Sequence, residues 1–200
     1  MTTTCFLITS AGEACRSLRR YTTGEQHCPT HGTWGHSAAV AIDPAPLIRD
    51  TRGFLVNKDS FASDDPRWPV QCEACGYVFQ ADDPRVVDYD EIYLGPEGQR
   101  YHTRLTRSPM PGAEPAPAGA MWSAPWMADA WRGPDGLALY LRLPDGHDWF
   151  IDGPSRSGGF WTRTGTPPRL TVTPSIASPG YHGWLNDGAL TADIEGRTYG

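Results

Sequence analysis

The stretch LALYLRLPDGHDWFI, residues 137–151, decides the fold class of this 200-residue chain. Apolar and aromatic residues fill its two ends, 137–143 and 148–151, and its centre is the turn tripeptide Pro144-Asp145-Gly146. Proline fixes φ at a value that suits a turn, and glycine tolerates a positive φ. The stretch therefore predicts two antiparallel strands joined by a tight turn.

The same signals recur along most of the chain. Runs of β-branched and aromatic residues between turn residues predict further strands at 3–8, 54–57, 77–80, 86–94, 100–105, 159–163, 169–173, 181–185 and 189–194. The last two are joined across Asn186-Asp187-Gly188, a strong hairpin signal. With 22 glycines and 19 prolines there is little room for helix, which we expect only at 10–20 and 120–131. We predict a mainly β protein with little helix.

The two halves of the chain differ in chemistry. All five cysteines precede residue 76, whereas five of the eight tryptophans lie between residues 122 and 161. Between these regions runs SPMPGAEPAPA, residues 108–118, whose composition favours an extended, semi-rigid spacer. We predict a β domain at 1–107, this spacer, and a small Trp-rich antiparallel β domain at 119–200.

Two short motifs carry the strongest chemical signal. They are Cys28-Pro-Thr-His31-Gly32 and Cys72-Glu-Ala-Cys75-Gly76. Two ligands separated by two residues can bind one ion from a tight turn, and the glycine that follows lets backbone N–H groups point at sulfur. Thiolates with one imidazole suit zinc, and four protein ligands leave no open position. We therefore predict one structural Zn²⁺ ion held by Cys28, His31, Cys72 and Cys75.

The two motifs resemble the knuckle pair of zinc ribbons and rubredoxin-like sites. The intervening segment, residues 32–71, is longer than the usual ribbon spacing and predicts an inserted loop or strand pair. His27 and His36 are alternatives to His31 as the fourth ligand, because only spacing distinguishes them.

Two other interpretations of the cysteines remain open. Cys72 and Cys75 could be buried thiols or a redox pair, although such a pair usually opens a helix and the residues after Cys75 favour a strand. Cys5 and Cys15 are expected to fill apolar positions.

Composition and charge exclude several function classes. The formal net charge of −6 gives no global positive field, so nucleic acid is disfavoured as a partner. A short basic run, Arg16, Arg19 and Arg20, keeps a nucleic-acid-binding zinc ribbon as an alternative. No apolar run approaches the roughly 18 residues that span a bilayer, and no basic segment precedes the first apolar patch. We expect a protein without membrane contact or Sec export.

Catalysis is an alternative in the second half. His147, Asp148, Asp152, His182 and Asp187 offer imidazoles and carboxylates that could form the base and its orienting acid in a hydrolase. Their spacing matches no motif with a known mechanism. We expect that these residues do not form a catalytic site, so an enzyme is the less favoured class.

Four phrases in the second half resemble uncharacterised proteins of actinobacterial phages: GAMW at 119–122, HDWFID at 147–152, TPP at 166–168 and YHGWL at 181–185. Lys58 is the one lysine among 17 basic residues, a bias typical of GC-rich genomes. The resemblance implies an accessory phage protein and transfers no catalytic residue.

Taken together, these features predict a non-enzymatic, zinc-stabilised structural or interaction protein with protein partners, such as a capsid or tail component. We place it in the cytoplasm of a bacterial host or in the virion. We expect part of the segment 108–131 to contact another chain, with Arg104 and Arg107 at the rim of that contact.

Overall fold

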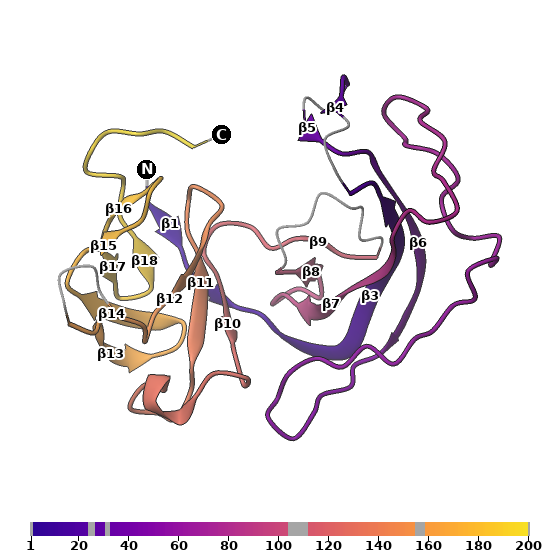
Figure 1. The fold of residues 1–200 in the computed structure, drawn as a ribbon. Coiled ribbons are helices and arrows are strands. Elements are labelled where there is room, and N and C mark those ends of the chain that lie inside the picture. The colour runs from indigo at the N-terminus through magenta and orange to yellow at the C-terminus, as the bar shows by residue number, and fades with distance from the viewer. Residues whose placement is uncertain (1, 24–26, 31–32, 104–111, 155–158, 200) are drawn as a thin grey trace.

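The computed structural model describes residues 2–23, 27–30, 33–103, 112–154 and 159–199, and Figure 1 shows two β-rich halves side by side. The knuckle half contains β3 (Thr9–Tyr21), β4 (His27–Cys28), β5 (Thr33–Trp34), β6 (Ser37–Pro46), β7 (Arg85–Leu94), β8 (Arg100–His102) and β9 (Glu114–Pro115). The Trp-rich half contains β1 (Thr3–Thr4), β2 (Phe6–Leu7), β10 (Ala120–Ser123), β11 (Leu139–Arg142), β12 (Asp148–Phe150), β13 (Thr162–Thr166), β14 (Arg169–Thr173), β15 (Ile176–Ala177), β16 (His182–Gly183), β17 (Leu185–Asn186) and β18 (Ala189–Leu190). The predicted mainly β class is confirmed.

The knuckle half is built on a five-stranded sheet with the order β6-β3-β7-β8-β9. Its longest strand, β3, occupies the segment 10–20 where a helix was expected, so that prediction is wrong. Alanine, leucine and arginine are good helix formers, but β3 pairs with a neighbour along both edges, and this pairing overrides the helix propensity. Ala14, Cys15 and Leu18 are fully buried as a result.

The neighbouring strand β6 was missed, because its sequence SAAVAIDPAP is poor in strand-favouring residues. β6 lies at the edge of the sheet, where proline is tolerated. The strands expected at 54–57 and 77–80 do not form: Leu55 and Val78 make only isolated bridges, to Arg49 and Gln71.

The Trp-rich half confirms both predicted hairpins. β11 pairs with β12 across the turn at 144–146, and β17 pairs with β18 across Asp187-Gly188. Asp187 and Gly188 both have positive φ, 44° and 76°, as the favoured two-residue hairpin turn requires. The helix expected at 120–131 is wrong, because that segment contains strand β10 and only a short 3-10 helix, η1 (Asp129–Trp131).

The tryptophans divide between core and surface. Trp122 and Trp149 are buried, and Trp149 makes an edge contact with Trp161 at a ring separation of 5.2 Å. Trp131 and Trp184 remain more than a third exposed. The main core of this half also contains Leu139, Leu141, Leu143, Ile151, Leu170, Ile176, Tyr181, Leu185 and Leu190.

Chain crossings tie the halves together. β1 and β2 lie in the Trp-rich half, where β1 pairs with β18 and β2 runs parallel to β10 (Figure 1). β9, from the proline-rich segment, pairs with β8 of the knuckle half, and the following Ala116 is buried beside Ile8 and Trp122. The domain boundary expected after residue 107 stays a prediction. Within the described part of the chain, no helix has the length and apolarity to cross a bilayer.

Candidate metal centre

Four metal-ligating side chains meet at one end of the knuckle half. The donor atoms of Cys28, His36, Cys72 and Cys75 all lie within 4.8 Å of one another. The three cysteines are those that the two motifs indicate, and the histidine is one of the alternatives. His31 and the side chain of His27 lie outside the described part of the structure.

Cys28 comes from a short hairpin. It ends β4 and pairs with Thr33 of β5. Its side chain is fully buried and contacts Cys72 and Phe79 in a small apolar cluster. The hairpin therefore directs this thiol into the interior of the knuckle half.

His36 lies where the chain enters β6. Its backbone N–H donates to Thr22 Oγ1 at 2.8 Å, and the Thr22 N–H donates to the His36 carbonyl at 3.0 Å. The imidazole stacks on Tyr77 with ring centroids 4.2 Å apart and planes 5° apart. These contacts hold His36 Nδ1 3.1 Å from Cys75 Sγ.

The second knuckle has the geometry that its sequence predicts. The Cys72 N–H donates to the Tyr77 carbonyl at 2.8 Å, and the Gly76 N–H donates to the Cys72 carbonyl at 2.9 Å. Gly76 has a φ of 74°, a backbone conformation that residues other than glycine rarely adopt. The resulting turn presents Cys72 and Cys75 to the same point.

Arg20 supports this knuckle from the end of β3. It is buried, and its guanidinium lies 5.2 Å from the centre of the Phe79 ring. It also donates to the backbone carbonyls of Gln80 and Pro69. One residue of the basic run therefore holds the second knuckle against the sheet.

The other two arginines of that run are engaged within the molecule. Arg16 donates to Asp59 at 2.7 Å, and Arg19 donates to Asp88 at 2.5 Å. An arginine that is already paired offers less positive charge to a phosphate backbone. The structure thus adds no support for the nucleic-acid alternative.

The cluster favours one thiolate over the others. Burial acts to raise the pKa of Cys72, but three backbone N–H groups point at its sulfur and lower the pKa to about 6. These N–H groups belong to Ala74, Ser37 and Cys75. The pKa of the neighbouring Cys75 thiol is raised instead. The Tyr77 N–H acts to lower this pKa, but burial and the sulfurs of Cys28 and Cys72 outweigh that effect.

This pattern distinguishes the cluster from the two remaining cysteines. Burial raises the pKa of Cys5 to about 12 and that of Cys15 to about 11, so both stay protonated apolar groups. At the cluster, by contrast, several thiolates can coexist only if a cation neutralises them.

The donor set fits a zinc ion. Zn–S distances of about 2.3 Å in a tetrahedral shell hold the sulfur atoms about 3.8 Å apart. The observed spread of up to 4.8 Å needs only a small contraction of the four side chains. Three sulfurs and one imidazole nitrogen are the ligands that zinc takes in closed structural sites.

Each of the five polar residues considered for catalysis is paired with a residue of its own. The pairs are His147–Asp145 at 3.2 Å, Asp148–Arg142 at 2.7 Å, Asp152–Arg163 at 2.7 Å, Asp187–Arg169 at 2.6 Å and His182–Glu195 at 3.1 Å. The expectation that they form no catalytic site stays a prediction.

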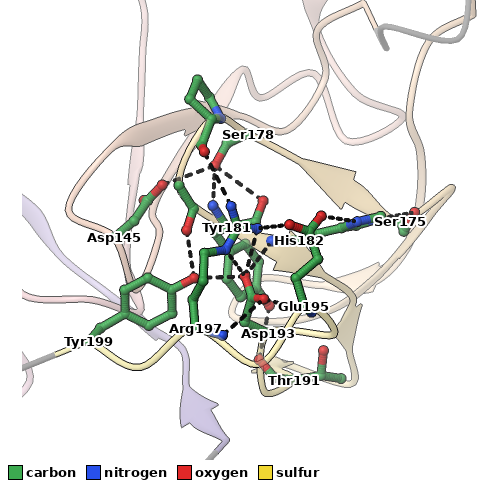
Figure 2. A network of polar contacts seen from close by, with 12 residues as sticks. Asp145, Ser175, Ser178, Tyr181, His182, Thr191, Asp193, Glu195, Arg197 and Tyr199 are labelled. Atoms are coloured by element: carbon green, nitrogen blue, oxygen red, sulfur yellow. Dashed lines mark hydrogen bonds and ion pairs between the residues drawn. The ribbon is translucent and has the colours of Figure 1, made fainter.

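His182 lies between a serine and a glutamate, an arrangement that the sequence did not indicate (Figure 2). Its Nε2 lies 3.4 Å from Ser175 Oγ and its Nδ1 lies 3.1 Å from Glu195 Oε1. The order hydroxyl, imidazole, carboxylate is that of serine hydrolases. No local motif could have indicated it, because Ser175 lies between β14 and β15, His182 lies in β16, and Glu195 follows β18.

The centre of the network in Figure 2 is Asp193 rather than His182. Its carboxylate accepts hydrogen bonds from the His182 N–H at 2.8 Å, from Tyr199 Oη at 2.7 Å and from Arg197 Nε at 3.1 Å. Burial acts to raise the pKa of Asp193, but these donors outweigh it and hold the pKa well below its usual range. The network therefore fastens the segment after β18 to the Trp-rich half.

Comparisons with protein-family models, with curated proteins and with solved structures found no match to this chain. The class of protein is therefore defined by its own fold and site: a mainly β protein with a group of three cysteines and one histidine that could bind one metal ion.

Proposed function

We propose that this chain is a non-enzymatic interaction protein whose knuckle half is stabilised by one structural zinc ion. The observation that carries the proposal is the closed donor set, in which four protein atoms surround one point and three of the four residues are buried. A zinc ion with four protein ligands has no open position for water or substrate. It contributes to folding rather than to catalysis.

The knuckle half needs such a contribution. Among the residues that the structure describes, the cluster around the knuckles contains only Cys28, Ala38, Cys72 and Phe79 as buried apolar residues. The connection between β6 and β7 forms isolated bridges instead of further strands. One ion would link the β4–β5 hairpin, the start of β6 and the second knuckle. In zinc-finger peptides, such sites provide about 10–16 kcal/mol of apparent binding free energy.

Protein partners are the second part of the proposal. Several large apolar side chains lie on the surface of both halves, among them Val70 at 68% exposed, Val78 at 60% and Phe160 at 58%. Where such groups form a contiguous patch, they favour association with other proteins. Together with the resemblance to phage proteins and the arginine bias, they support a component of a larger assembly such as a phage virion.

Metal analysis tests the proposal. We expect purified protein to contain about one equivalent of zinc, and Cys72→Ser to lose it, because a hydroxyl is a poor replacement for a thiolate ligand. Cys15→Ser is the matched control: it changes a buried cysteine outside the cluster and should keep the metal. Folded wild-type protein with less than about a tenth of an equivalent would contradict the structural role.

The same measurement identifies the fourth ligand. His36→Asn should lose zinc and His31→Asn should keep it, because His36 is the histidine whose ring lies within 4.8 Å of the three sulfurs in the described structure. The reverse result would assign the site to the sequence-predicted His31. Retention of zinc in both variants would show that His27 or a solvent molecule completes the shell.

A further inference from the structure

A cleft of about 470 Å³ lies between the two halves, remote in sequence from the zinc ligands. Its walls come from the knuckle half, through β7 and the loop after β6, and from the Trp-rich half, through β10, β11 and β12. The volume falls within the range of about 300–1,000 Å³ that small-molecule sites occupy. Neither half could form this cleft alone.

Aromatic rings dominate the walls. Phe54, Tyr89, Trp122, Trp126 and Tyr140 all line the cleft. Trp122 and Tyr140 stack on each other, with centroids 5.8 Å apart and planes 11° apart, and form a rigid base. Phe54 is 46% exposed, so its ring is accessible to a ligand. The cleft thus combines a fixed aromatic base with an open aromatic side.

Two carboxylates provide its polar groups. Asp148 pairs with Arg142 at 2.7 Å and keeps 27% of its side chain exposed. Asp90 is buried, and its carboxylate lies 3.6 Å from the His102 ring. Asp148 therefore offers acceptor oxygens to the cleft while Arg142 lies beside it, whereas Asp90 already accepts the Glu91 N–H.

The charge balance selects the ligand class. An organic cation would be drawn to the aromatic faces, but an arginine of the chain already lies beside three of these rings: Arg142 is 5.9 Å from the centre of Trp122, Arg49 is 5.3 Å from that of Trp126, and Arg52 is 5.3 Å from that of Phe54. These arginines are paired with the carboxylates of Asp148, Glu91 and Asp50, respectively. A ligand of either charge would therefore meet a group of its own charge. A neutral ring with apolar C–H faces and hydroxyl donors at its edge fits both the aromatic walls and the acceptors.

We propose that this cleft binds a neutral saccharide, with a sugar ring against Phe54 and Trp126 and its hydroxyl groups donating to Asp148. The site acts independently of the zinc ion, because none of the four metal ligands lines the cleft. Binding here would give the protein a carbohydrate-recognition activity in addition to its structural role.

Tryptophan fluorescence and calorimetry with defined probes test the proposal. The probes are tetrasaccharides of glucose, mannose, galactose and N-acetylglucosamine, with tetramethylammonium as the cationic comparison. We expect at least one saccharide to bind with a Kd of about 1 mM or tighter, and Phe54→Ala to weaken it by about tenfold or more. Phe54 is exposed, so this variant should keep the fold.

Matched variants separate the cleft from other aromatic surfaces. Trp184→Ala removes a tryptophan that is 39% exposed and does not line the cleft, and should leave the affinity unchanged. Asp148→Asn should weaken binding without unfolding the chain, as circular dichroism would verify. The proposal is overturned if no saccharide binds at about 10 mM, if Phe54→Ala binds as tightly as wild type, or if only tetramethylammonium binds.

Discussion

Asp148 is a strand residue whose carboxyl group is partly buried beside Arg142, with 27% of its side chain exposed. Burial raises its pKa to about 6, Arg142 acts to lower it, and Asp90 raises it further. The ordinary pKa of an aspartate is 3.8, so between pH 3.8 and about pH 6 the folded chain binds this proton more tightly than the unfolded chain does. The corresponding stabilisation is complete below the unfolded pKa and is lost as the pH rises through the folded pKa.

We therefore expect the Asp148 carboxyl to titrate near pH 6 in a carbon-detected NMR experiment. The free energy of unfolding of wild type, compared with that of Asp148→Asn, should fall as the pH rises from about 4 to about 7. A titration midpoint close to 3.8 would show that Arg142 dominates over burial.

At the scale of the element, the hairpins could be predicted and the central strand could not. The turns at 144–146 and 186–188 are specified by adjacent residues, so local chemistry was sufficient. β3 and β6 become strands because distant segments pair with them, and no short window of sequence contains that information. His36 was likewise only an alternative, because the pairing of Thr22 with His36 brings this ring to the cysteines.

Gly119 lies directly before β10, and its backbone packs against Thr3 and Thr4 of β1. It has a φ of 88°, and a Cβ there would lie 2.5 Å from the Thr4 carbonyl oxygen. Gly98 has a similar φ of 83° with open space around it. Alanine should cost about 1 kcal/mol at Gly98 from backbone strain alone and about 2–4 kcal/mol at Gly119, where the clash is added. Urea unfolding of the two variants measures this difference, and equal losses would show that the N-terminal strands yield without cost.

In the molecule as a whole, the Trp-rich half is built from two separate parts of the chain, one before and one after the knuckle half. The first strands complete the Trp-rich half, the chain then builds the knuckle half, and it returns through β9 and β10. Each half nevertheless has its own source of stability. The Trp-rich half has the large apolar core, and the knuckle half has the candidate metal site.

This division predicts opposite responses to two treatments. Deleting residues 1–7 removes Cys5 and Leu7 from the Trp-rich core and leaves β10 and β18 with one strand partner each, β11 and β17, so that half should lose about 3 kcal/mol or more. The zinc content should stay near one equivalent, because none of the four ligands contacts β1 or β2 through the sheet pairing.

A zinc chelator added to the full chain should instead raise amide exchange in β6 and around the knuckles while β11 and β14 stay protected. Loss of zinc on deletion, or uniform exchange after chelation, would mean that both halves unfold as one cooperative unit.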